Sequence, residues 1–205
     1  LEEFCEQLMW EYVPQQDIRL KENNHILMSG EDIKKILTEM KGRTIKDIYD
    51  RLRDILISKL ESQMFGKGLS YTQEMQKRMY SFYENYFARR TVKDSVFDIY
   101  NRFVKSEFNK GVKCEIIENE PDLYDLAALA FIYKRLKETE VVREACHVVI
   151  DEAQDFGISV YRSLKYCLSK CTFTIMGDVA QNINLGCGLG DWEELKDVML
   201  PEEYD

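Results

Sequence analysis

The sequence lacks the features that mark membrane and secreted proteins. No stretch approaches the roughly 20 consecutive apolar residues that a membrane-spanning helix needs. The N-terminal residues LEEFCEQLMW carry acids where a secretory signal carries basic residues. Together these absences predict a cytoplasmic protein that does not bind membranes.

Patterns typical of metal sites are also absent. The six cysteines are scattered and include no C-x-x-C pair, and histidine occurs only at His25 and His147. Cys167 and Cys171 would lie one turn apart on a helix, but the sequence offers few further nitrogen or sulfur ligands to complete a zinc site. We therefore expect reduced thiols and no bound zinc.

Positive charge is scarce. The 28 Lys and Arg residues are outnumbered by 37 Asp and Glu residues, which gives a formal net charge of −9. Because nucleic-acid binding draws most of its affinity from cations that neutralise phosphates, this chain alone should not bind nucleic acid strongly. Residues 88–93 and 41–59 are locally basic, but in 41–59 the cations alternate with acids, as they do on a solvated helix face.

What the sequence does contain is the composition of a globular protein. Over 205 residues, 45% are hydrophobic and 32% are charged, a balance that predicts a packed core in one large or two small domains. The chain begins at Leu1 and not at a methionine. We therefore expect it to be a piece of a longer protein.

The first 120 residues have the pattern of helices joined by short polar turns. The segments SGED (29–32), TIKD (44–47) and TVKD (91–94) each place a hydroxyl three residues before an acid, which is typical of a helix N-cap. The glycine in NKG (109–111) should end the last of these helices. After 44–47, apolar residues recur every three or four positions and predict one buried helix face: Ile45, Ile48, Leu52, Ile55, Leu56 and Leu60.

A second stripe consists of methionine and aromatic side chains at helical spacing. Its members are Met75, Met79, Phe82, Tyr83, Tyr86 and Phe87. Exposed rings in such a row could stack on nucleic-acid bases. Helical spacing favours the core instead, and the core is what we expect.

A boundary between two regions is expected near Pro121. The region before it, residues 1–120, is predicted to be helical, and residues 121–205 are predicted to form a second unit. The second unit begins with an amphipathic helix at 122–139, in which small alanines permit close packing.

Two short β-branched runs in the second unit predict strands. The runs at 146–150 and 172–176 are too short for helices, and between them residues 157–170 have helical spacing. Strand, helix and strand in this order predict a parallel βαβ unit. The sequence therefore predicts an α/β fold with a large helical part.

Each predicted strand is followed directly by a turn that contains an acid and a glutamine, DEAQD (151–155) and GDVAQ (177–181). Because ligands collect at the carboxyl ends of parallel strands, we expect these turns to lie side by side at a binding site. One acid could hold Mg²⁺ while phosphate oxygens and water complete its coordination, and a second could activate a water molecule. The alternative is that these acids only cap a helix.

The order of strand, D-E-A-Q-D, helix, strand and G-D-x-x-Q-x-I is closely similar to motifs II and III of the superfamily 1 helicases of the UvrD/Rep type. Within that superfamily the chain most resembles the helicase IV-like branch, which includes the RNA-polymerase-associated HelD proteins. The similar segments are DLAALAFIYKRL (125–136), HVVIDEAQDF (147–156), FTIMGDVAQNI (173–183) and GLGDWEEL (188–195). The resemblance implies a partial RecA-like segment at 121–205, preceded by a helical 1B-like subdomain at 1–120.

The resemblance also implies roles for residues of the first turn. Asp151 would coordinate Mg²⁺, and Glu152 would be the base that activates water for ATP hydrolysis. Gln154 would belong to the same nucleotide-facing turn.

In the second turn, the resemblance implies that Gln181 senses the γ-phosphate of ATP and couples hydrolysis to movement on nucleic acid. Gly177 and Asp178 would shape the turn that holds it. Trp192 corresponds to a region that approaches single-stranded nucleic acid in relatives, although we expect a buried tryptophan here.

Two parts of a complete helicase are missing from the sequence. There is no G-x-x-x-x-G-K-[ST] phosphate-binding loop, and the arginine-bearing motifs of a second RecA-like domain are absent. We therefore expect half of an ATP site, which becomes active with ATP and Mg²⁺ only in a longer protein that acts on DNA and could also bind RNA polymerase.

Two other functions compete with the helicase interpretation. The first is a non-catalytic helical module that binds RNA polymerase or another protein and uses its acidic turns only as helix caps. The second is a phosphohydrolase with Asp151 and Asp178 as metal ligands, but the sequence shows no supporting cluster of acids or histidines.

Overall fold

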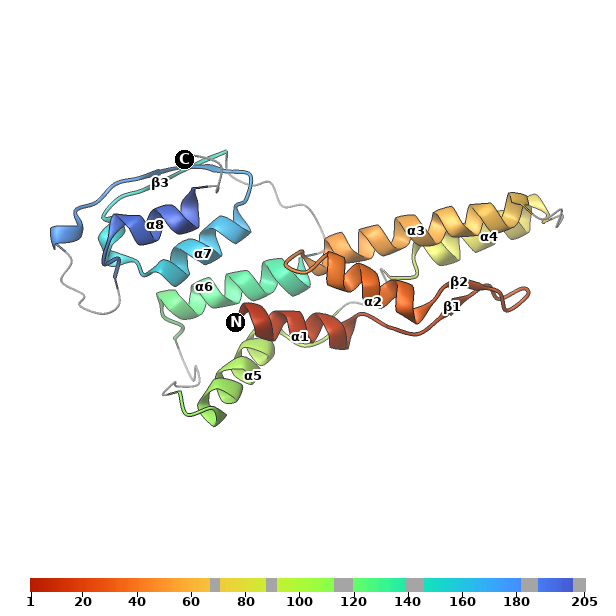
Figure 1. Cartoon of the computed structure of the whole chain (residues 1–205), viewed down its shortest axis with the longest axis horizontal. Helices are drawn as coiled ribbons and strands as arrows, with labels where there is room; N and C mark the ends of the chain where they lie inside the picture. The colour runs from red at the N-terminus through yellow and green to blue at the C-terminus, as the bar shows by residue number, and fades with distance from the viewer. Residues whose placement is uncertain (67–70, 88–91, 113–119, 139–145, 182–187, 201–205) are drawn as a thin grey trace. The chain divides into compact units, whose positions relative to one another are not determined.

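The computed structural model describes residues 1–66, 71–87, 92–112, 120–138, 146–181 and 188–200 (Figure 1). The fold is α/β with mostly helices and two small two-stranded sheets, one antiparallel and one parallel. Contacts divide the chain into two compact units. Unit 1 consists of Leu1–Asp94 with Arg135–Thr139, and unit 2 consists of Ser95–Lys134 with Glu140–Asp205.

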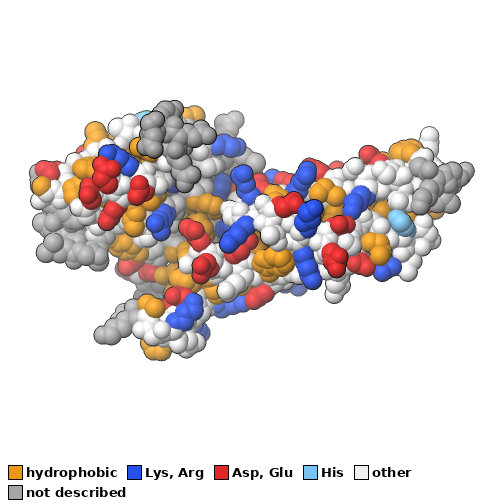
Figure 2. Space-filling view, viewed as in Figure 1, with side chains coloured by type: hydrophobic (Ala, Val, Ile, Leu, Met, Phe, Trp, Pro, Cys, Tyr) orange, Lys and Arg blue, Asp and Glu red, His pale blue; other side chains and the backbone are white. Residues whose placement is uncertain are grey.

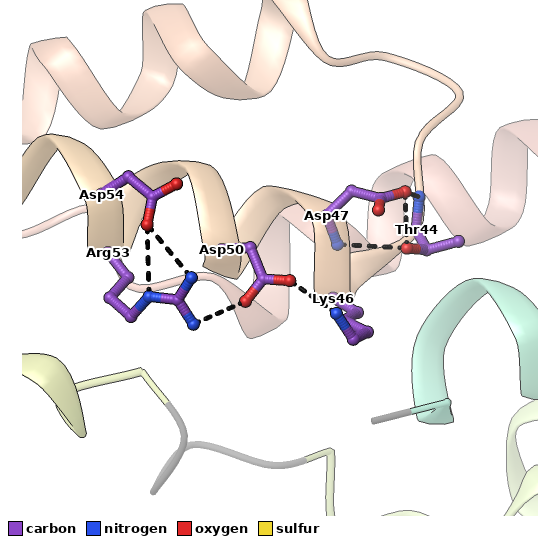
Figure 3. Close-up of polar contacts among 6 residues, drawn as sticks. All are labelled: Thr44, Lys46, Asp47, Asp50, Arg53 and Asp54. Carbon is purple, nitrogen blue, oxygen red and sulfur yellow. Dashed lines mark hydrogen bonds and ion pairs between the residues drawn. The ribbon is translucent and has the colours of Figure 1, made fainter. Parts of the chain in front are cut away.

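Unit 1 contains four helices and the antiparallel sheet among its described residues. They are α1 (Glu2–Tyr12), β1 (Ile18–Arg19), β2 (Ile26–Met28), α2 (Gly30–Glu39), α3 (Ile45–Gly66) and α4 (Gln73–Glu84). The first two predicted caps are confirmed. The Ser29 hydroxyl accepts from the backbone N–H of Asp32 at 3.1 Å, and Asp32 accepts from the backbone of Ser29. Thr44 and Asp47 make the same reciprocal pair before α3 (Figure 3).

The predicted apolar face of α3 is confirmed as core. Ile48, Leu52, Leu56 and Leu60 are fully buried, Ile45 is nearly so, and Ile55 at the edge of the stripe is half-buried. Burial of four such side chains removes a large apolar area from water. Helix α3 therefore contributes a large part of the hydrophobic core of unit 1.

The opposite face of α3 carries the alternating charges that the sequence suggested (Figure 3). Lys46 and Arg53 both contact the carboxylate of Asp50, at 2.6 and 2.8 Å, and Arg53 also contacts Asp54 at 3.0 Å. These cations are therefore neutralised on their own helix. Figure 2 shows the same mixture of basic and acidic side chains over the visible face.

The aromatic stripe contributes to the core of unit 1, as expected. Met79, Tyr83 and Phe87 are buried, and the ring of Phe87 stacks on that of Tyr49 with centroids 5.5 Å apart. The Tyr83 hydroxyl donates to the backbone carbonyl of Arg19 at 2.8 Å. Met75, at the start of the stripe, is 40% exposed.

A short segment from later in the sequence completes unit 1. Helix α6 (Leu123–Ile132) continues into a π-helical turn, Tyr133–Lys137, whose last residues belong to unit 1. The buried guanidinium of Arg135 forms an ion pair with Glu6 of α1, and Leu136 is buried. Lys137 donates to the backbone carbonyls of Val92 and Asp94. The core of unit 1 thus depends on residues separated widely in sequence.

Unit 2 begins with α5 (Val96–Asn109), whose start corrects one prediction. The cap is Ser95 with Asp98, not the predicted pair at 91–94. The Ser95 hydroxyl accepts from the backbone N–H of Asp98 at 3.1 Å, and the Asp98 carboxylate accepts from the backbone N–H of Ser95 at 3.2 Å, so a complete capping box starts the helix four residues later. Helix α5 ends at Asn109, and Gly111 has a φ of +89°, as the predicted glycine stop requires. The division between the units lies at Asp94 and Ser95, and α5 packs against α6 within unit 2.

The parallel βαβ unit is confirmed. Strands β3 (His147–Ile150) and β4 (Thr172–Ile175) pair in parallel, with His147 opposite Thr172 and Ile150 opposite Ile175. Helix α7 (Ile158–Cys167) connects them, and α8 (Trp192–Met199) follows (Figure 1). One side of the sheet packs on these helices around a core whose fully enclosed centre is Tyr161 and Ala153.

Several predicted features fall on residues that the structure does not describe. They include the basic residues 88–91 and the end of the helix expected at 122–139. No helix among the described residues is both long and apolar enough to span a membrane.

Candidate functional site

The two acidic turns lie side by side, as the sequence predicted. The turn after β3 contains a short 3₁₀ helix, Ala153–Asp155, and the turn after β4 contains another, Val179–Gln181. The backbone N–H of Met176 donates to the carbonyl of Ile150, and the N–H of Ala153 donates to the carbonyl of Met176, each at 2.9 Å. The ends of the parallel strands therefore hold both turns at one edge of the sheet.

The side chain of Gln154 joins the two turns. Its Oε1 accepts from the backbone N–H of Asp178 at 3.0 Å, and its Nε2 donates to Glu152 Oε2 at 2.8 Å. Its own carbonyl accepts from the N–H of Leu189 at 3.0 Å. Gln154 is only 4% exposed, so the amide is enclosed within the protein and does not face solvent.

Gly177 is the point of closest approach between the turns. A Cβ atom at this position would lie 2.5 Å from Gln154 Oε1 and 2.7 Å from the backbone nitrogen of Ala153. Both distances are shorter than van der Waals contact allows. A glycine is therefore required here for steric reasons.

The two acids of the first turn are exposed. Asp151 accepts from the backbone N–H of Glu152 at 2.9 Å through Oδ1. Glu152 has φ +52° and ψ +43°, the left-handed region, which costs a residue with a side chain about 1–2 kcal/mol. Such strain is often found at functional sites, and here it falls on the residue predicted to be the catalytic base.

Tyr161 of α7 forms a buried hydrogen bond with the first turn. Its hydroxyl donates to the carbonyl of Ala153 at 2.7 Å, and both residues are fully buried. Burial raises the pKa of Tyr161 to about 12, so the phenol stays protonated and remains a donor. In the sequence, Tyr161 is one residue of the segment 157–170 that has helical spacing. The other residues on its face of the helix are apolar, so the polar hydroxyl of Tyr161 was the signal that could have predicted its hydrogen bond to the first turn.

The second turn contains a hydrogen bond to the side chain of Asp178. Its Oδ1 accepts from the backbone N–H of Ala180 at 3.0 Å, which closes the turn that leads to Gln181. Gln181 ends the 3₁₀ helix, and its side chain lies outside the described part of the structure. Trp192 is half-buried against the core of unit 2, closer to the expected buried tryptophan than to a free ring.

The donor set at this edge fits Mg²⁺ only in part. Among the described residues, no three His, Cys, Asp or Glu side chains gather as a metal site would require. Mg²⁺ commonly binds proteins through one or two carboxylates, with water and substrate phosphates as its remaining ligands. The exposed Asp151 carboxylate is suited to this mode of binding. The described residues do not provide enough ligands to hold a metal ion by protein side chains alone.

A cavity of about 480 Å³ lies within unit 1, away from these residues. Its lining includes Tyr49, Phe87 and Leu136, together with the paired charges of α3. None of the predicted site residues lines it.

Comparison with known proteins gives no match to this chain among family models, curated proteins or solved structures. The chemistry of the two turns is therefore the basis for assigning a function.

Proposed function

We propose that this chain is part of an ATP-dependent superfamily 1 helicase or translocase and supplies the Mg²⁺-binding acid and the catalytic base of its ATP site. One observation carries the proposal. Two acid-containing turns stand at the carboxyl edge of a parallel strand pair, and Gln154 connects them. Ligands of open α/β sheets bind at this edge.

In this proposal, residues 121–205 are a partial RecA-like segment and residues 1–120 contain a helical 1B-like subdomain. Asp151 holds Mg²⁺ through its exposed carboxylate, and the ion neutralises charge on the phosphates of ATP. Glu152 orients the attacking water and accepts its proton. Gln181 responds to the γ-phosphate from the adjacent turn.

The phosphate-binding loop must come from elsewhere in a longer protein, because the sequence contains none. The isolated chain should therefore not hydrolyse ATP at a useful rate. In the longer protein we propose DNA as the track, RNA polymerase as a possible second partner, and the cytoplasm as the location.

The test is nucleic-acid-stimulated ATP hydrolysis by the full-length protein that contains this chain. Glu152→Gln keeps the size of the side chain but removes the base, so turnover should be abolished while ATP binding is retained. The matched control is Glu193→Gln, which changes an exposed acid of α8 in the same unit. Unchanged turnover in Glu152→Gln would remove the assignment of the base.

A second substitution tests the coupling role of the neighbouring turn. Gln181→Ala should leave basal hydrolysis measurable but reduce its stimulation by nucleic acid. Normal stimulation in this variant would contradict the assignment of Gln181.

The rival function, a non-catalytic helical interaction module, is favoured by a different observation. Helices α5 and α6 expose large apolar side chains, with Phe97 at 52%, Phe108 at 64% and Leu126 at 51%. Apolar residues of this kind are common in protein interfaces. A full-length protein with no phosphate-binding loop and no ATPase activity would favour this function instead.

A further inference from the structure

We infer that Gln154 is a positioning residue that ties the Glu152 carboxylate to the turn after β4, so that the two turns move together. This inference rests on the proposed function, because it assigns Gln154 a role in placing the proposed base. The sequence resemblance suggested only that Gln154 shares a nucleotide-facing turn. In the structure its amide is enclosed and bonded at both ends within the protein.

The chemistry of the two partners explains why a glutamine stands here. The backbone N–H of Asp178 is a donor, and the Glu152 carboxylate is an acceptor. A primary amide provides one of each on a single planar group. A glutamate could not donate to a carboxylate when ionised, and a leucine could serve neither partner.

The same partners fix the orientation of the amide. Since a backbone N–H cannot accept a hydrogen bond, the oxygen of Gln154 must face Asp178 and the nitrogen must face Glu152. The Asp178 contact leads directly into the turn that ends at Gln181. A shift of that turn is thus transmitted to the Glu152 carboxylate through one side chain.

Gly177 provides the space in which this amide lies. Because an added Cβ would stand 2.5 Å from Gln154 Oε1, Gly177→Ala must displace the amide from Asp178 or move the backbone of the turn. Two substitutions at different positions should therefore have the same effect. Gly190→Ala is the matched control, since a Cβ at Gly190 has no neighbour within 4 Å and its backbone is not left-handed.

The first measurement is amide hydrogen exchange of the Asp178 N–H in this chain, which requires no ATPase activity. Gln154→Leu and Gly177→Ala should each accelerate exchange roughly tenfold, as expected for loss of one hydrogen bond. Gly190→Ala should not change it. Gln154→Glu keeps an oxygen for Asp178 and should preserve most of the protection, and it also serves if Gln154→Leu fails to fold.

The second measurement is the kinetics of the full-length protein. Gln154→Leu and Gln154→Glu should both lower kcat for ATP hydrolysis at least tenfold with little change in KM, because each loses the donor to Glu152. A merely structural role predicts that Gln154→Glu, which retains the Asp178 bond, has normal kcat.

The outcomes separate this inference from the proposed function. Unaltered exchange at Asp178 in Gln154→Leu overturns the connection between the turns, whatever the kinetics. Faster exchange with normal kcat overturns the positioning role. If instead Glu152→Gln has no effect on turnover, the proposed function itself is wrong.

Discussion

Unit 1 buries the apolar face of its main helix, whereas the parallel sheet of unit 2 leaves one face open among the described residues. Leu52 and Leu56 of α3 are fully buried, but Val149 of β3 is 60% exposed and Met176 after β4 is 46% exposed. Parallel sheets are normally covered on both faces. Apolar side chains are thus buried on α3 and exposed on one face of the sheet, because burial also requires another element to pack against that face.

The largest expected loss of stability comes from a substitution that creates a cavity in the core of unit 1. Leu52→Ala should reduce the free energy of unfolding of unit 1 by about 2–5 kcal/mol, because the fully buried side chain leaves a void. Val149→Ala, on the open face, should cost unit 2 less than about 1 kcal/mol.

Urea unfolding followed by tryptophan fluorescence can measure both effects. The chain has two tryptophans, Trp10 in unit 1 and Trp192 in unit 2, so a Trp→Phe background at either position lets the other report its own unit. A loss at Val149 comparable to that at Leu52 would mean that the sheet face is covered in solution.

The next effect concerns the enclosed part of unit 2. Tyr161→Phe should destabilise this unit by roughly 1–2 kcal/mol, because the buried carbonyl of Ala153 loses its donor. Unfolding of the variant in urea at neutral pH, with Trp192 as reporter, measures the loss. No change in stability would show that the carbonyl finds another donor.

The pH dependence of the same variant gives a second check. The pKa of Tyr161 is raised from 10.0 to about 12 by burial, so its contribution to stability is complete below pH 10 and is lost as pH rises through 12. The wild type should therefore lose unit 2 stability over this range more steeply than Tyr161→Phe.

A smaller effect is expected at the surface of unit 1. Ser29→Ala removes the cap of α2 and should cost about 1 kcal/mol. Ser81→Ala, at an exposed position within α4, is the control and should be nearly neutral. Equal midpoints for the two variants in urea would contradict the capping role.

Acid titration sharpens the same test. The ion pair with Lys59 and the backbone N–H of Ser29 lower the pKa of Asp32, so its stabilising effect is present above its ordinary pKa and disappears as the pH falls through the lowered value. Lys59→Met should make the stability of unit 1 less dependent on pH in that acidic range.

Much of this architecture was predictable because its signals are local. The stripe of α3, the parallel strands and the adjacent turns follow from residue spacing and β-branched runs. The start of α5 was misplaced because T-V-K-D at 91–94 and S-V-F-D at 95–98 carry the same capping pattern, and the helix begins after the second.

The remaining features depend on contacts that no local pattern encodes. The division at Asp94 reflects the pairing of segments such as α1 and residues 135–139. The role of Gln154 depends on backbone geometry in both turns and on the space left by Gly177. Sequence placed these residues in the site but could not orient their side chains.

The ion pair between Glu6 and Arg135 has a consequence for synthesis of the protein. These residues are 129 positions apart, which corresponds to roughly 6–26 s of translation at about 5–20 residues per second. Helix α1 therefore leaves the ribosome long before Arg135, whose guanidinium pairs with Glu6 of that helix. Unit 1 therefore cannot complete its core until residues 135–139 have been made, and a polypeptide that stops at Asp94 would expose the surface that Arg135 and Leu136 cover.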